Sequence, residues 1–124
     1  MTRDMNLIRN IFVAIQSRKD ARFENLEITG VDNDVLSRHL EMLLSAGLIE
    51  GTISGAYNDA SPKILVKDLS WEGHDLASAL ANDGVWSKIK ELYTPSQLAT
   101  LPLKVISEVA KGLLTRWALS AAGL

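Results

Sequence analysis

AGLIEG at Ala46–Gly51 and LSWEGHDL at Leu69–Leu76 are the two stretches that decide the fold. Gly47 follows an apolar run with helical spacing, at a place where a left-handed residue commonly ends a helix. Ser70 follows a β-type run and is a residue type that caps a helix N-terminus. The segment between them, SGAYNDASP at Ser54–Pro62, has the composition of a turn. The pattern therefore predicts a helix, a β-hairpin and a second helix.

Apolar spacing, capping residues and turn residues extend this reading to both ends of the chain. The predicted elements, in chain order, are a helix over Met5–Ile15, an edge strand over Phe23–Ile28 that ends at Gly30, a helix capped by Asp32, hairpin strands over Leu48–Ile53 and Lys63–Leu69, helices capped by Ser70 and by Asp83, one turn at Thr94–Gln97 with capping-box spacing, and a helix over Pro102–Ala121.

This order of helix, short strand, helix, hairpin and helix is that of a winged helix with a C-terminal helical extension. We expect an α+β fold that is mainly α. Residues 1–82 form the winged-helix-like part and residues 83–124 pack on it, in a single structural domain. At 124 residues the chain can bury about two-thirds of its unfolded surface, so no covalent staple is needed.

Several longer motifs resemble a known family. Ala-Gly-Leu-Ile before a hairpin and Leu-Ser-x-x-Gly after it are similar to many winged-helix regulators. The whole pattern resembles the phage- and prophage-associated domain-of-unknown-function family 2513, and the resemblance implies a winged-helix-like fold but no activity. The motifs that carry it are RDMNLIRNI at Arg3–Ile11, RHLEMLLSAGLIEG at Arg38–Gly51, LSWEGHDL, VWSKIKE at Val85–Glu91 and LPLKVISEVAK at Leu101–Lys111.

Composition excludes several classes of protein. The chain has no cysteine, which excludes disulfides and cysteine-ligated metal sites. Its formal charge of −2 gives no global attraction to nucleic acid. The apolar region at Leu98–Leu124 contains Lys104, Glu108, Lys111 and Arg116, which are costly in a bilayer core. We expect a soluble, cytoplasmic protein with no membrane partner and no cofactor.

LSWEGHDL is also the best candidate for an active site, because it places Trp71, His74 and two carboxylates within about one helical turn. His74 has no second ligand at metal-binding spacing, and His39 lies on a different helix. No Ser-His-Asp order, phosphate loop or paired-carboxylate pattern occurs elsewhere. We therefore expect no enzyme activity, no catalytic residue and no metal site. Trp71 and Gly73 are instead predicted to pack at the junction of hairpin and helix.

The remaining large aromatic residues have different expected roles. Trp86 and Trp117 each fall in an apolar helical stripe, which predicts a place in the core. Tyr57 lies among small and polar residues at the hairpin tip, where we expect it to be exposed and able to contact a partner.

Two functions stay open on this basis. In a helix-turn-helix, the N-terminal part of the second helix reads the major groove of DNA. Here the candidate DNA contacts of that helix are Asn33, Ser37 and Arg38, and Arg38 is suited to hydrogen bonding with guanine. The carboxylates of Asp34 and Glu41 would repel the DNA phosphates. The predicted phosphate contacts are Arg18, Lys19, Arg22 and Lys63.

The first function is therefore a phage-type regulator of transcription that binds double-stranded DNA. The alternative is a winged-helix module that binds a host or phage protein and no DNA. We also expect a homodimer through the C-terminal helix, because that helix is apolar over a wide arc. The apolar residues are Val105, Ile106, Val109, Leu113, Leu114 and Trp117.

Overall fold

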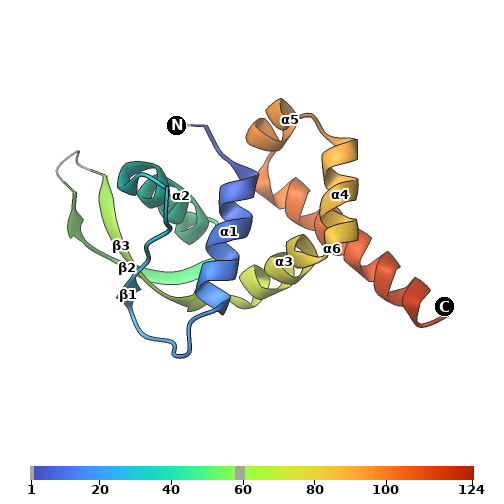
Figure 1. Cartoon of the computed structure of the whole chain (residues 1–124), viewed down its shortest axis with the longest axis horizontal. Coiled ribbons are helices and arrows are strands. Elements are labelled where there is room, and N and C mark those ends of the chain that lie inside the picture. The colour runs from blue at the N-terminus through green and yellow to red at the C-terminus, as the bar shows by residue number, and fades with distance from the viewer. Residues whose placement is uncertain (1, 58–60) are drawn as a thin grey trace. The chain divides into compact units, whose positions relative to one another are not determined.

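The computed structural model describes residues 2–57 and 61–124 (Figure 1). Asn58 and Asp59, which were expected in the hairpin turn, lie outside the described residues. The elements in chain order are α1 (Met5–Gln16), β1 (Glu24–Asn25), α2 (Asn33–Ser45), β2 (Ile49–Ala56), β3 (Pro62–Leu69), α3 (Trp71–Ala81), α4 (Asp83–Leu92), α5 (Pro95–Thr100) and α6 (Leu103–Ala121).

The fold is α+β and mainly helical, as predicted, and its arrangement is consistent with a winged helix. The chain divides into two compact units. The hairpin unit comprises residues 10–74, and the helical unit comprises residues 2–9 with residues 75–124. This division assigns most of α3 to the helical unit, whereas the sequence-based division extended the winged-helix-like part to residue 82.

The sheet of the hairpin unit is antiparallel, with the order β1-β3-β2. β1 is shorter than the predicted strand, since only Glu24 and Asn25 pair with β3, opposite Val66 and Leu65. The next residue, Leu26, is buried, so the chain has already turned into the core there. The hairpin itself is predicted well, and its β2 strand extends to Ala56.

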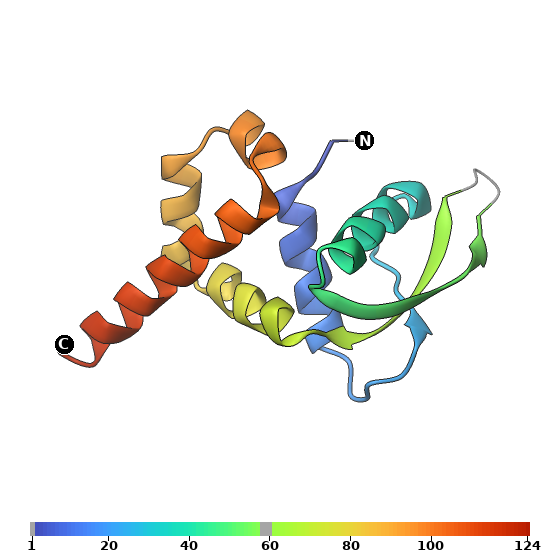
Figure 2. The ribbon, with the colours of Figure 1, turned by 180° about the vertical axis from the view of Figure 1, so that it is seen from behind.

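One face of this sheet is covered by α2, as both ribbon views show (Figures 1 and 2). Ile64 and Val66 of β3 are fully buried, and α2 buries its own apolar stripe. Gly51 allows the close approach of β2 and β3, because a Cβ there would lie 2.9 Å from the carbonyl oxygen of Leu65. The buried leucines of α2 are Leu36, Leu40 and Leu43.

The two motifs that decided the fold perform the predicted local tasks. Gly47 has a φ of 73°, in the left-handed region that favours glycine. The Ser70 hydroxyl accepts a hydrogen bond from the Gly73 backbone N–H at 3.0 Å and donates to the Gly47 carbonyl oxygen at 2.6 Å. Ser70 therefore caps α3, as predicted, and also ties it to the end of α2.

The helical unit is held by helix caps and by packing between α4 and α6 (Figure 2). Asn82, and not Asp83 as predicted, caps α4 by accepting from the Val85 N–H at 3.0 Å. The capping box of Thr94 and Gln97 is confirmed. α6 begins one residue after Pro102 and buries Ile106 and Ala110, which agrees with the predicted helix.

Candidate functional site

Trp71, the first residue of α3, is 86% exposed, so its predicted place in a packed junction is wrong. Gly73 does lie at that junction, because a Cβ there would be only 1.9 Å from the carbonyl oxygen of Leu48. Two residues of helix correspond to a rotation of about 200°. Gly73 faces the β2 end of the hairpin, and Trp71 must therefore point away from it.

A hollow of about 250 Å³ lies beside Trp71 in the hairpin unit, and its other lining residues are Glu50, Asp68, Leu69 and His74. Glu50 and Asp68 are cross-strand partners in the β2–β3 ladder. Like charges directly opposite each other on a sheet repel, so this pairing is unfavourable for the hairpin. We call these five residues the Trp71 surface.

His74 contacts one carboxylate within this surface. Its Nε2 atom lies 3.6 Å from the Asp68 carboxylate, which also accepts from the Leu69 N–H at 2.7 Å. The other histidine, His39, is buried, and its Nδ1 atom lies 2.8 Å from the Val35 carbonyl oxygen. In residues 2–57 and 61–124, no group of three His, Cys, Asp or Glu side chains is placed to hold a metal ion.

The predicted DNA-reading face of α2 is largely engaged in the protein itself. Ser37 is only 3% exposed, and its hydroxyl donates to the Pro62 carbonyl oxygen, so it is removed from the set of candidate base contacts. The Arg38 guanidinium lies 3.7 Å from the Asp34 carboxylate and 3.6 Å from that of Glu41. Asn33 is exposed at the start of the helix. This face therefore offers little uncompensated positive charge.

The predicted phosphate contacts are only partly brought together. The Arg18 side chain is 16% exposed and donates to the carbonyl oxygens of Val66 and Arg22. Arg22 is paired with Asp20 at 3.3 Å. Lys19 lines a second hollow of about 330 Å³ together with Lys67. Among the predicted cations, Arg18 mainly positions a loop.

Lys63 and Tyr57 complete the predicted set. Lys63 lies on β3 and is half-buried. Tyr57 is also half-buried, and its hydroxyl donates to the Asn25 side-chain oxygen at 3.2 Å, so it is not the free contact residue that was predicted.

Charge is distributed unequally between the units. The hairpin unit has six lysines and arginines against ten aspartates and glutamates, a formal charge of −4. The helical unit has seven against five, a formal charge of +2. The unit that contains α2 and the β2–β3 hairpin is therefore the acidic one, and this charge opposes the approach of a nucleic acid.

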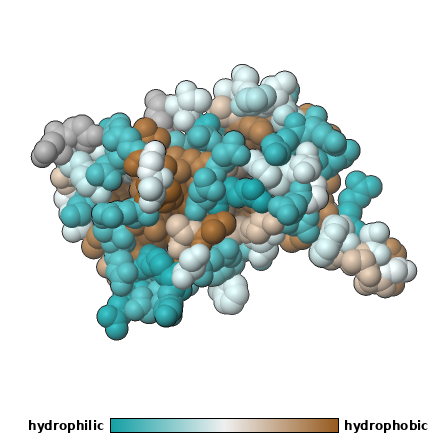
Figure 3. Space-filling model, in the orientation of Figure 1, coloured by the Kyte–Doolittle hydropathy of each residue, from teal (hydrophilic) through white to brown (hydrophobic). Residues whose placement is uncertain are grey.

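The C-terminal end of α6 carries further exposed apolar side chains. Trp117 is 55% exposed, and its predicted place in the core is wrong, whereas Trp86 is buried as predicted. Leu119 and Leu124 are exposed as well. Figure 3 shows tan and brown atoms at this end of the helix, on the right. Along the described chain, none of the helices combines the length and apolarity needed to cross a bilayer.

The fold and the Trp71 surface define a small α+β protein, consistent with a winged-helix-like arrangement, that exposes Trp71 on the hairpin unit. Residues 2–98 match a protein family described as "Hypothetical protein (DUF2513)", and the chain belongs to that family, as its motifs indicated. A similar protein is an uncharacterised protein of Haemophilus influenzae, which is 34% identical over 118 residues, covering 94% of this chain and 98% of the relative. No solved structure matches the chain.

Two features of the Trp71 surface were not predicted from the sequence. The exposure of Trp71 follows from the close contact of Gly73, and the spacing of two residues between them was the available signal. The pairing of Glu50 with Asp68 depends on the hairpin register, which is irregular between Glu50 and Gly51. No pattern in the sequence announces that irregularity.

Proposed function

We propose that the chain is a winged-helix-like module that binds another protein, of phage or host origin, through the Trp71 surface. The observation that carries this proposal is the exposure of Trp71 at 86%. Burial of the apolar area of an exposed indole against a partner would be favourable in free energy. Tryptophan is among the residues most enriched at the energetic centres of protein interfaces.

The charge around Trp71 supports a basic partner. Glu50 and Asp68 stand opposite each other beside the indole, and the hairpin unit carries a formal charge of −4. A lysine or arginine of the partner would relieve the repulsion of the two carboxylates and lie against the ring face. We therefore expect the affinity to fall as the salt concentration rises.

Binding of double-stranded DNA, with a role in transcription, is the second candidate. It is favoured by the helix–hairpin order and by Lys19, Lys63 and Lys67, which have no ion pair within the described residues. The pairing of Arg38 with Asp34 and Glu41 weighs against it. The protein-interaction function is therefore the better supported of the two.

A comparison of two tryptophan variants tests the proposal. Trp71→Ala and Trp117→Ala remove the same side chain from two exposed positions. We expect a partner protein, isolated on the full chain from the source organism, to lose affinity by about 30-fold for Trp71→Ala, because interface centres contribute about 2 kcal/mol or more. Trp117→Ala should bind this partner normally. Equal binding by all three proteins would contradict the proposed surface.

A DNA titration distinguishes the second candidate. Fluorescence anisotropy with genomic duplex fragments at low salt should show no saturable binding up to about 100 µM protein, the weak end of ordinary non-specific affinity. Saturable binding that is weakened by Lys19→Gln or Lys63→Gln, and not by Trp71→Ala, would replace the protein-interaction function with the DNA-binding one.

A further inference from the structure

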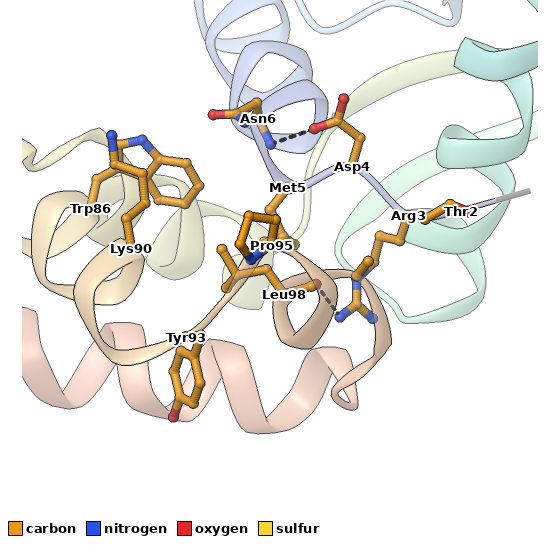
Figure 4. Close-up of a pocket in the computed structure, with 11 residues that line it drawn as sticks. Thr2, Arg3, Asp4, Met5, Asn6, Trp86, Lys90, Tyr93, Pro95 and Leu98 are labelled. Atoms are coloured by element: carbon orange, nitrogen blue, oxygen red, sulfur yellow. Dashed lines mark hydrogen bonds between the residues drawn. The ribbon is translucent and has the colours of Figure 1, made fainter.

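The helical unit contains a pocket of about 490 Å³ that none of the predicted functions uses. α4 and α5 form one side of it, and the residues before and at the start of α1 form the other (Figure 4). Trp86 and Lys90 lie side by side on α4, and Arg3 points to the carbonyl oxygen of Leu98. The lining residues include Arg3, Asp4, Trp86, Lys90, Pro95 and Leu98.

Two cations line this pocket, and neither has a carboxylate partner among the described residues. Arg3 is held in place, because its Nη2 atom donates to the carbonyl oxygens of Leu98 at 2.7 Å and Leu101 at 2.5 Å. Its Nε atom is buried without a hydrogen-bond partner, and burial lowers the pKa of this guanidinium. The two hydrogen bonds of Nη2 fix the position of the guanidinium at the pocket.

Lys90 supplies the second charge. Its Nζ atom lies 5.6 Å from the centroid of the Trp86 ring, which is also approached by the guanidinium of Arg9 at 5.4 Å. Lys88, two residues earlier, is paired instead with Glu91 at 3.6 Å and does not line the pocket. The ammonium of Lys90 therefore remains available for an anion at the pocket wall.

The net formal charge of the side chains that line the pocket favours an anion with a single negative charge. Arg3 and Lys90 are opposed by the carboxylate of Asp4, which accepts from the Asn6 N–H at 2.9 Å at the start of α1. One positive charge is left over. The rest of the wall includes Pro95 and Leu98, which offer apolar contact. A doubly charged phosphate would carry more negative charge than this one positive charge balances. A wholly polar ligand would make no apolar contact with Pro95 and Leu98.

We propose that this pocket binds a small monocarboxylate with a compact apolar body. The carboxylate accepts hydrogen bonds from the Lys90 ammonium in the field of Arg3, and the apolar body packs against Pro95 and Leu98. This site is independent of the Trp71 surface, since its residues all belong to the helical unit.

Phenylacetate and its neutral amide, phenylacetamide, are the probes. The full chain is titrated with each, and the indole N–H signal of Trp86 is followed by NMR after Trp71→Phe and Trp117→Phe have assigned the other two. We expect a saturable shift with phenylacetate and binding of the amide that is weaker by about tenfold, because a charge-assisted hydrogen bond is lost.

Two lysine variants on the same helix provide the matched control. Lys90→Gln should weaken phenylacetate binding by about tenfold, and Lys88→Gln should leave it unchanged. Trp71→Ala should not alter it, so a failure here is distinguishable from a failure of the proposed function. Equal binding of acid and amide, equal effects of the two lysine variants, or no shift up to about 10 mM phenylacetate would overturn the proposal.

Discussion

Gly73 is the residue whose replacement should damage this fold most directly. Its missing side chain admits the carbonyl oxygen of Leu48 to within 1.9 Å of the position that a Cβ would take. Gly73→Ala must therefore displace the start of α3 or the backbone of Leu48 before β2, and we expect the free energy of unfolding to fall by about 3 kcal/mol, the upper part of the usual range for overpacking. Urea denaturation of the full chain measures this change.

Gly112 in α6 provides the control, because a Cβ there meets open space and glycine is costly inside a helix. Gly112→Ala should stabilise the chain by about 0.5 to 1 kcal/mol. Trp71→Ala should change stability by less than about 1 kcal/mol, since its ring is in water. A large loss of stability from Trp71→Ala, or no loss from Gly73→Ala, would contradict the placement of Gly73 against the hairpin and of Trp71 in solvent.

The side chain of Ser70 stabilises the start of helix α3 within the hairpin unit. The Ser70 hydroxyl both caps the Gly73 N–H and donates to the Gly47 carbonyl oxygen. Ser70→Ala removes both bonds, and we expect a loss of about 1 to 2 kcal/mol. Ser120→Ala, in the exposed last turns of α6, should cost less than about 0.5 kcal/mol. Similar losses for both serines would reject the cap as the cause.

For the whole molecule, a homodimer through α6 remains the expected assembly. From Gly112 to Leu124 the chain carries Arg116 as its single charge, and Trp117 and Leu119 are exposed on this segment. Self-association would remove these side chains from water. Light scattering of the full chain should give twice the mass of one chain at about 50 µM, a concentration at which micromolar dimers are mostly assembled.

The double variant Trp117→Glu with Leu119→Glu should give the mass of a single chain and an unchanged circular dichroism spectrum, because these side chains are not part of the core. A wild-type monomer at this concentration, or a variant that still has the doubled mass, would exclude α6 as the dimer interface.

The sequence by itself determined the order of the elements and most of their ends. Gly47, Ser70 and the capping box at Thr94 act on backbone groups within a few residues, so their effect is readable locally. The same holds for the apolar spacing of α2 and α6, which follows from the helical repeat.

Only the tertiary structure decided which of the chemically suitable side chains remain free. The contact of Gly73 with Leu48 sets the rotation of α3 about its axis and so directs Trp71 into solvent. The packing of α2 on the sheet buries Ser37. The pocket that Arg3 and Lys90 line joins residues far apart in the chain. These outcomes depend on the contact that each element makes with a distant partner. A local pattern specifies that an element has an apolar face, whereas close packing against the partner selects the rotation and register at which that face is buried.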